Sequence, residues 1–386
     1  MSEFVLVALL WLQLQLGALR ALERLPDPWS HLTVAVVWSA SLAASWAVVA
    51  RRVRPRWRVL ATPWPAGALV VLVAVCAAFV YPSIDDRRST GGGSDADDAV
   101  LLVVERVRDG DDPYAADTYL GNPPTTGPGS VVWALPFPGR RAQALAVVAA
   151  LAALLALLRR WSGSWELSSV TALVLAASVP VWEGVAQGSD HLAMACGLAL
   201  LVTGVQQQVR RDLPVRTSRW HWVGWGVLAG VLATWRAAYL HLPLLVAAAL
   251  WRRSRRAALL VGGVGTGVAL ALHSWLLAST ASWDDYDPVQ QLVVKSDEDL
   301  GAAGRALVAV VVVAVAVAVL AELRRAAPRL DVLVLAGIGA PLAGIAVAGT
   351  FTADDPGSWS EASYLLPALV LAAVVAARAV VGSRSL

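Results

Sequence analysis

Long apolar runs separated by short polar segments repeat along the whole chain. Twelve of these runs are candidate membrane-spanning helices, because a bilayer core of about 30 Å requires about 20 residues of helix. They cover residues 4–20, 30–50, 64–81, 142–158, 166–181, 190–207, 221–236, 238–251, 257–277, 304–321, 330–350 and 363–381. The pattern predicts an all-α, polytopic membrane protein with about 12 transmembrane helices. Residues 1–386 are expected to form a single transmembrane domain.

Two segments depart from this regular pattern. Arg236 interrupts the apolar sequence between the short runs 221–236 and 238–251, so the turn between them is expected inside the membrane. Residues 128–138 are apolar but too short to span a bilayer. We expect this second segment to form a half-helix or re-entrant piece that leads into the next span.

The composition supports a membrane protein and excludes a nucleic-acid binder. Hydrophobic residues make up 58% of the chain and charged residues 15%, against about half and a quarter in soluble domains. The net charge of +3 comes from arginines placed between the apolar runs and not from one basic patch. Cys76 and Cys196 lie within apolar runs, and the five histidines show no metal-ligand spacing.

The distribution of basic residues predicts the orientation in the membrane. Alternate loops and the C-terminus carry 20 of the 31 basic residues, and this side is expected to be cytoplasmic, with both termini on it. The three longest polar segments, residues 82–127, 278–303 and 351–362, all fall on the opposite side. Any chemistry or recognition is therefore expected to face outward.

The first outer loop contains a group of aspartates followed by an amphipathic segment. Asp95, Asp97 and Asp98 precede residues 97–108, whose apolar stripe is predicted to be Leu101, Leu102, Val104 and Val107. A helix of this kind is suited to lie at the membrane interface with its apolar face on the lipid. Capping of the helix by an aspartate is the simpler explanation for the acids, and it accounts for one of them better than for three.

Polar residues beside the apolar runs are the other candidates for function. Gln187, Asp190 and His191 have the spacing of one helical face between two spans. Arg236 lies within a span, where an arginine costs about 2.5–3.5 kcal/mol and therefore has a partner or a task. Its planar guanidinium suits a phosphate. The alternatives are snorkelling to the interface and pairing with an acid from another helix.

The order of several short motifs resembles a known family, the bacterial polyprenol-phosphate-mannose-dependent mannosyltransferase-like enzymes of the GT-C class. The motifs lie between about residue 64 and residue 381. They are the aspartates at 95–98 with Gly110-Asp-Asp-Pro-Tyr114, Asn122-Pro-Pro with Leu135-Pro136, Gln187-Gly-Ser-Asp190, Arg236 with Leu242-Pro-Leu-Leu, and Ser358-Trp-Ser-Glu-Ala-Ser-Tyr364-Leu-Leu-Pro.

The resemblance implies an inverting membrane glycosyltransferase. Its donor would be a polyprenyl-phosphate-linked sugar, mannose or another hexose or pentose, and its acceptor a lipid or a cell-envelope glycan at the extracytoplasmic face. Asp97 is the preferred general base, with Asp95 and Asp98 as alternatives, and Arg236 would bind the donor phosphate. The expected substrate pocket comprises Tyr114, Asn122, Gln187, Asp190, His191, Trp359, Glu361 and Tyr364.

No cofactor is expected, and nucleic acid is not an expected partner. Asp95 and Asp97 form a DxD pair that could hold a divalent metal, an interpretation that is less favoured because polyprenol-phosphate users of this class mostly work without one. Two other functions remain open. One is a lipid or glycan transporter or flippase, and the other is a non-catalytic membrane subunit of an envelope-synthesis complex.

Overall fold

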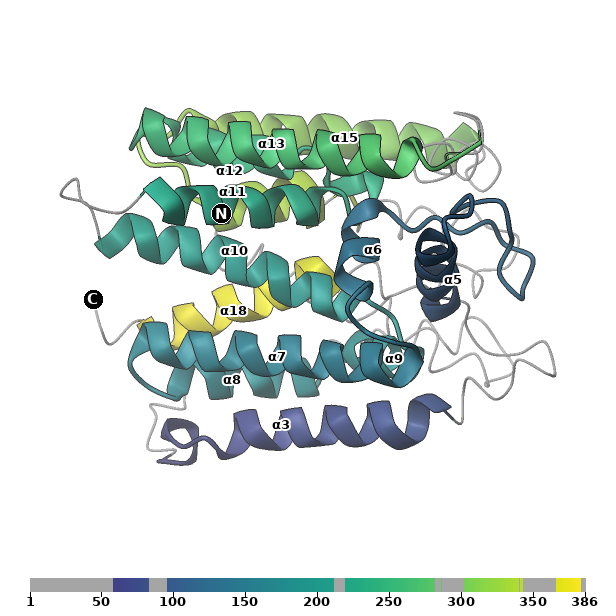
Figure 1. Cartoon of the computed structure of the whole chain (residues 1–386). Coiled ribbons are helices and arrows are strands. Elements are labelled where there is room, and N and C mark those ends of the chain that lie inside the picture. The colour runs from purple at the N-terminus through teal and green to yellow at the C-terminus, as the bar shows by residue number, and fades with distance from the viewer. Residues whose placement is uncertain are drawn as a thin grey trace.

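The computed structural model describes residues 58–82, 96–211, 219–281, 286, 302–339, 341–342 and 366–382, and these residues contain helices and no strand (Figure 1). The α-helices are α3 (Trp64–Val75), α5 (Ala96–Asp109), α6 (Pro128–Ala134), α7 (Arg140–Ser162), α8 (Glu166–Ala176), α9 (Val179–Ala186), α10 (His191–Arg211), α11 (Arg219–Ala233), α12 (Leu242–Trp251), α13 (Arg255–Leu277), α15 (Ala302–Leu323), α16 (Leu330–Val334) and α18 (Leu366–Gly382). Short 3₁₀ or π turns are η1 (Arg58–Ala61), η2 (Cys76–Val80), η4 (Ala237–Tyr239) and η5 (Leu335–Gly339).

Three of the described helices are long and apolar enough to cross a membrane on their own. They span Arg140–Ser162, His191–Arg210 and Arg255–Leu277. The pair Glu166–Ala176 and Pro180–Ala186 makes a fourth candidate if its two parts form one span. Other apolar helices are shorter, including Trp64–Val80 and Leu366–Ala379. The all-helical prediction agrees with the described part of the chain, while twelve spans stay a prediction.

Most predicted runs within the described residues correspond to helices. The run 142–158 lies within α7, and the run 257–277 lies within α13. The run 190–207 lies within α10 except for its first residue. The runs 4–20 and 30–50 lie outside the described residues. Of the run 330–350, residues 330–339 and 341–342 are described.

The predicted run 166–181 is interrupted by a break in the structure. Helix α8 ends at Ala176, Ser178 has an extended backbone, and α9 starts at Val179 with an axis bent by 74°. Pro180 in the first turn of α9 explains the break, because proline has no N–H to donate to the backbone oxygen of Ala176, four residues earlier. This bend turns α9 away from the path of α8.

Helix α10 forms the centre of the bundle. It packs against α7, α11 and α18, and its residues between Leu192 and Val205 are largely buried. The long helices run side by side in Figure 1, with α3 and α13 on opposite sides of α10. One apolar cluster joins residues of α3, α7, α8, α10, α11, α12 and α18, so these helices share a single core.

The two ends of the bundle differ in charge. At one end lie α5 and α6, and we call this the site end; the arginine end is the opposite one (Figure 1). Arg252 Nη1 donates to the backbone oxygens of Arg324 and Arg325 there, which ties α12 to the end of α15. The described turns at the arginine end carry Arg159, Arg160, Arg210, Arg211, Arg219, Arg252, Arg253, Arg255, Arg256, Arg324 and Arg325.

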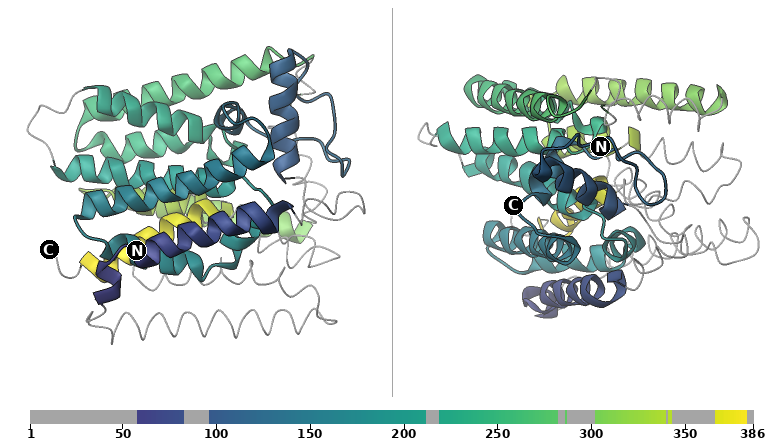
Figure 2. Two further views of the ribbon diagram at one scale, coloured as in Figure 1. Left: turned by 60° about the horizontal axis from the view of Figure 1, so that its bottom comes forward. Right: turned by 45° about the vertical axis from the view of Figure 1, so that its right-hand side comes forward.

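Helix α5 lies across the site end of the bundle and does not run along the long helices (Figures 1 and 2). Its predicted range agrees with the structure, but its predicted stripe was partly wrong. Val100, Val103 and Val104 are the buried residues, whereas Leu101 and Leu102 are only half-buried. The buried face packs on a second apolar cluster formed by α6, Tyr114, Leu276 of α13 and Tyr286, so it rests on protein.

Candidate functional site

The first turn of α5 places Asp97 and Asp98 at the site end of the bundle. Both carboxylates lie near the positive end of the helix dipole, which stabilises negative charge. Asp97 is 2% exposed and accepts a 2.5 Å hydrogen bond from Tyr81 Oη, at the end of the helical segment that begins with α3. Arg140, the first residue of α7, donates to Asp98 Oδ1 at 2.5 Å, and its Nε is 3.8 Å from Asp97 Oδ2.

Arg236 lies at a break between two apolar helices, as the sequence predicted. Helix α11 ends at Ala233, Arg236 has an extended backbone, and the turn η4 leads to α12. Its Nη1 donates to Ser130 Oγ at 3.3 Å and to the Trp235 backbone oxygen at 2.9 Å. The side chain is 12% exposed. Among the alternatives for this arginine, pairing with an acid from another helix is confirmed.

Asp190 is that acid, and it is completely buried just before α10. Arg236 Nη2 lies 3.3 Å from Asp190 Oδ1, and Trp235 Nε1 donates to Asp190 Oδ2 at 2.6 Å. His191 Nδ1 lies 2.7 Å from Ser189 Oγ and 3.7 Å from Asp190 Oδ1. A buried charge pair of this kind survives desolvation only because both charges are paired and hydrogen-bonded. Asp190 therefore orients Arg236.

Gly188 lies between Asp97 with its partner Tyr81 and Asp190 with its partner Arg236. Its φ of +68° is a left-handed conformation that favours glycine. A β-carbon built at this position would lie 2.5 Å from Tyr81 Cε2 and 3.1 Å from Asp97 Cβ. The turn that carries Asp190 thus packs directly against the tyrosine that holds Asp97. One short turn therefore contacts the predicted general base Asp97 and carries Asp190, the partner of the predicted phosphate-binding arginine.

The half-helix α6 closes the site from a third direction. A β-carbon at Gly127 would lie 2.1 Å from the Thr234 backbone oxygen, and one at Gly129 would lie 2.2 Å from the Val231 backbone oxygen. Gly129 N also donates to the Thr234 oxygen at 3.2 Å. These glycines let the start of α6 touch the end of α11. The contact brings Ser130 within hydrogen-bonding distance of Arg236.

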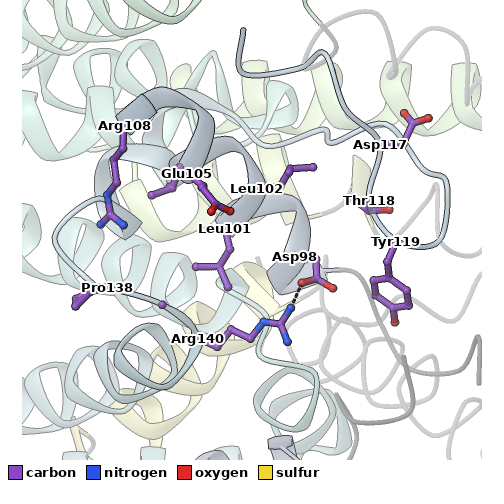
Figure 3. A pocket seen from close by; sticks show the side chains of 12 residues that line it. Asp98, Leu101, Leu102, Glu105, Arg108, Asp117, Thr118, Tyr119, Pro138 and Arg140 are labelled. Atoms are coloured by element: carbon purple, nitrogen blue, oxygen red, sulfur yellow. Dashed lines mark hydrogen bonds and ion pairs between the residues drawn. The ribbon is translucent and has the colours of Figure 1, made fainter. Parts of the chain in front are cut away.

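A pocket of about 480 Å³ opens beside Asp98, between α5, the loop at 117–119 and the start of α7 (Figure 3). Its polar groups come from carboxylates, arginines and hydroxyls, and its apolar surface from leucines and a proline. Figure 3 shows the Asp98–Arg140 ion pair at its edge. The lining residues are Asp98, Leu101, Leu102, Val104, Glu105, Arg108, Asp117, Thr118, Tyr119, Pro138, Gly139 and Arg140.

Three other predicted pocket residues have local structural roles. Tyr114 is buried, donates to the Thr126 backbone oxygen at 2.7 Å, and stacks edge-on against Tyr286 with ring centroids 5.6 Å apart. The backbone of Asn122 hydrogen-bonds Thr118, which shapes the loop beside the pocket. Gln187 ends α9 and donates to Glu183 Oε1 at 3.4 Å.

Four further candidates lie outside the described residues. They are Asp95, Trp359, Glu361 and Tyr364. Since Asp95 lies just before the described helix α5, the structure bears only on the choice between Asp97 and Asp98 as the general base. Asp98 is engaged by Arg140 at short distance, whereas Asp97 is held by a neutral hydroxyl. Asp97 therefore stays the preferred base.

Several residues that complete the site are not among the candidates that the sequence predicts. Tyr81, Ser130, Arg140 and Trp235 each contact a predicted site residue. A signal for Arg140 was present, because it is a basic residue at the start of an apolar run on the acid-rich side. Tyr81 and Trp235 are aromatic residues at helix ends, a position that in a membrane protein is equally typical of interfacial anchors.

Among residues 58–82, 96–211, 219–281, 286, 302–339, 341–342 and 366–382, no three His, Cys, Asp or Glu side chains gather in a group that could hold a metal ion. Comparison with known proteins found no matching family model, no matching curated protein and no matching solved structure. The chain is therefore defined by its own geometry: a helical bundle with helices able to cross a membrane and a polar, charged site at one end.

Proposed function

We propose that this chain is a multi-pass membrane glycosyltransferase of the GT-C type. It transfers a sugar, mannose or another hexose or pentose, from a polyprenyl phosphate to a lipid or cell-envelope glycan acceptor. The observation that carries the proposal is the turn at Gly188, which packs against Tyr81 and Asp97 and leads to Asp190. Tyr81 donates a hydrogen bond to Asp97, and Asp190 pairs with Arg236, so this turn links the two pairs. A carboxylate and an arginine are what an inverting transfer from a sugar phosphate requires.

In the proposed reaction, Asp97 acts as general base. An acceptor hydroxyl gives its proton to the Asp97 carboxylate while its oxygen forms a bond to the anomeric carbon of the donor sugar. The bond between that carbon and the phosphate oxygen breaks, and polyprenyl phosphate leaves with the electron pair. Because a phosphate is already stable as an anion, the leaving group needs no strong general acid.

Arg236 stabilises the negative charge that develops on the leaving phosphate. Its guanidinium is oriented by Asp190 and Ser130, so it does not need to reorganise during the reaction. Arg140 is a second cation at the same end of the bundle, and its side chain is 33% exposed. Its Nε lies 3.8 Å from Asp97, so this cation is also close to the proposed base.

The charge of the two ends supports an outward-facing site. Arginine-rich turns are typical of the cytoplasmic side of a membrane protein. The site end carries Asp97 and Asp98 of α5 together with Arg106, Arg108, Arg140 and Arg141, whereas most of the described arginines lie at the opposite end. We therefore propose a cell-membrane location with the site extracytoplasmic and both termini cytoplasmic. A lipid-linked donor would present its head group at that face.

A transfer assay with the full chain in detergent or liposomes tests the assignment of the base. Asp97→Asn keeps the shape of the side chain and can still accept the hydrogen bond from Tyr81, but it no longer takes a proton. Turnover should fall by about 10²–10⁴-fold while donor binding is retained. Asp111→Asn is the matched control, because Asp111 is an exposed aspartate just after the end of α5 and does not line the pocket. Near-normal turnover by Asp97→Asn would refute the assignment.

A transporter or flippase is the second candidate, and one observation favours it. The break between α11 and α12 places Arg236 on irregular backbone between two apolar helices, as in discontinuous helices that bind transported ions or substrates. The two functions differ in their dependence on Asp97. A transporter would move labelled lipid across liposomes unchanged in Asp97→Asn, whereas a transferase would lose product formation.

A further inference from the structure

The pocket beside Asp98 has two carboxylates that the protein itself does not use. Glu105 on α5 and Asp117 in the following loop both line it, and both side chains are exposed. Within the part of the chain that the structure describes, neither forms an ion pair or a side-chain hydrogen bond. Figure 3 shows them on two different segments of the pocket wall. Their oxygens are therefore available as hydrogen-bond acceptors for a bound molecule.

Unlike these two carboxylates, the two arginines of the pocket form hydrogen bonds with the protein itself. Arg140 is held by Asp98 at 2.5 Å, and Arg108 Nη2 donates to the Leu135 backbone oxygen at 2.5 Å. Their donor groups are thus partly directed at the protein. Each guanidinium keeps further N–H donors, but the lining contains the carboxylates of Asp98, Glu105 and Asp117 against the two arginines. Because carboxylates are in excess, the lining suits a molecule that donates many hydrogen bonds and carries no negative charge.

The rest of the lining fits the same kind of molecule. Leu101, Leu102 and Pro138 supply apolar surface, and Tyr119 supplies an aromatic ring. A sugar ring has polar hydroxyl groups around its edge and C–H groups on its faces, so it matches a mixture of carboxylates and apolar or aromatic side chains. The volume of about 480 Å³ lies in the range of small-molecule pockets.

We propose that this pocket binds a neutral glycan, the acceptor end of the transfer reaction, through hydrogen bonds from its hydroxyl groups to Glu105 and Asp117. This assignment rests on the proposed function and specifies its acceptor class. Asp98 and Arg140 line the pocket and connect it to Asp97, since Arg140 Nε is 3.8 Å from the Asp97 carboxylate. A glycan end in the pocket therefore lies beside Arg140, the side chain that links the pocket to the proposed base. An anionic lipid head group fits this lining less well.

Equilibrium binding without any donor tests the pocket by itself. The full chain in detergent is titrated with methyl glycosides of neutral disaccharides (mannose, glucose, galactose and arabinose series), followed by saturation-transfer NMR. Glu105→Gln and Asp117→Asn should each raise the Kd for the neutral disaccharide that binds by roughly tenfold, because a hydrogen bond to a charged group is lost. Asp111→Asn, in the same loop but outside the pocket, should leave the Kd unchanged.

Three results would overturn the pocket assignment. In the first, no neutral disaccharide binds at millimolar concentration. In the second, a glucuronic-acid disaccharide or glycerol phosphate binds more tightly than the neutral sugars. In the third, the Kd is unchanged in both Glu105→Gln and Asp117→Asn. A transfer assay separates this proposal from the proposed function. If the chain binds the sugar but transfers none, the pocket assignment stands and the proposed transferase function is rejected. If Glu105→Gln transfers sugar with an unaltered acceptor KM, only the pocket assignment is rejected.

Discussion

The substitution Gly188→Ala tests directly whether the turn at residues 187–190 positions the site. An alanine at φ +68° carries a cost of about 1–2 kcal/mol for the left-handed conformation. Its β-carbon would also lie 2.5 Å from Cε2 and 2.8 Å from Cζ of Tyr81. Relieving this overlap should cost about 1–3 kcal/mol more, as overpacking of a close-packed interior does. The expected loss of unfolding free energy is therefore about 2–5 kcal/mol.

Gly163→Ala is the matched control for the backbone contribution. Gly163 has a φ of +75°, but nothing lies within 4 Å of a β-carbon built there. It should lose only the conformational contribution of about 1–2 kcal/mol. Denaturant unfolding in mixed micelles measures both variants, and a transfer assay measures activity alongside. Gly188→Ala should also lower turnover, because the ring of Tyr81 holds Asp97.

A double-mutant cycle identifies the clash partner. If the overlap is with the ring of Tyr81, the double variant Gly188→Ala/Tyr81→Ala should be less destabilised than the sum of the single variants, by about 1–3 kcal/mol. Equal stability of Gly188→Ala and Gly163→Ala, or strict additivity in the cycle, would refute the reasoning. It would mean that the turn does not press on Tyr81.

Three further predictions concern the Arg236–Asp190 pair, the hydrogen bond from Tyr81 to Asp97 and the orientation in the membrane. Arg236→Ala should destabilise the protein by about 3–5 kcal/mol in denaturant unfolding, because it leaves the buried Asp190 carboxylate without its cation. Adding Asp190→Asn to Arg236→Ala should restore part of the stability but should not restore sugar transfer. Tyr81→Phe should lower kcat by about tenfold with little change in KM, since it removes one oriented hydrogen bond to Asp97 without touching substrate contacts; an unchanged kcat would make the hydroxyl irrelevant to catalysis. A cysteine at exposed position 111 should react with an impermeant thiol reagent from outside intact cells and one at exposed position 253 should not, and the reverse pattern would invert the proposed orientation.

The apolar pattern of the sequence predicted the helices well because helix formation in such segments is local. A long run without charges leaves the backbone no better way to satisfy its hydrogen bonds than a helix. The run 257–277 corresponds to α13, and the run 142–158 lies inside α7. The interruption at Arg236 was visible for the same reason, since a charge inside an apolar run is costly wherever it lies.

The sequence also identified Asp97, Asp190 and Arg236 as candidates, because ionisable groups beside apolar runs need an explanation. Their arrangement could not be read from spacing alone. Asp190 and Arg236 are 46 residues apart, and their contact depends on how α10 and α11 pack. The sequence left pairing and phosphate binding as alternatives for Arg236, and only the tertiary structure showed the pair.

Contacts between distant segments decided the rest of the site. Tyr81 reaches Asp97 from the end of the helix preceding α5, and Arg140 reaches Asp98 from 42 residues further along the chain. The face of α5 that is buried was likewise decided by its neighbours: Val100 and Val103 pack on α6 and Tyr114, while Leu101 faces the pocket. Hydrophobic periodicity indicates that a helix has an apolar face, but what that face covers depends on which segments packing brings beside it.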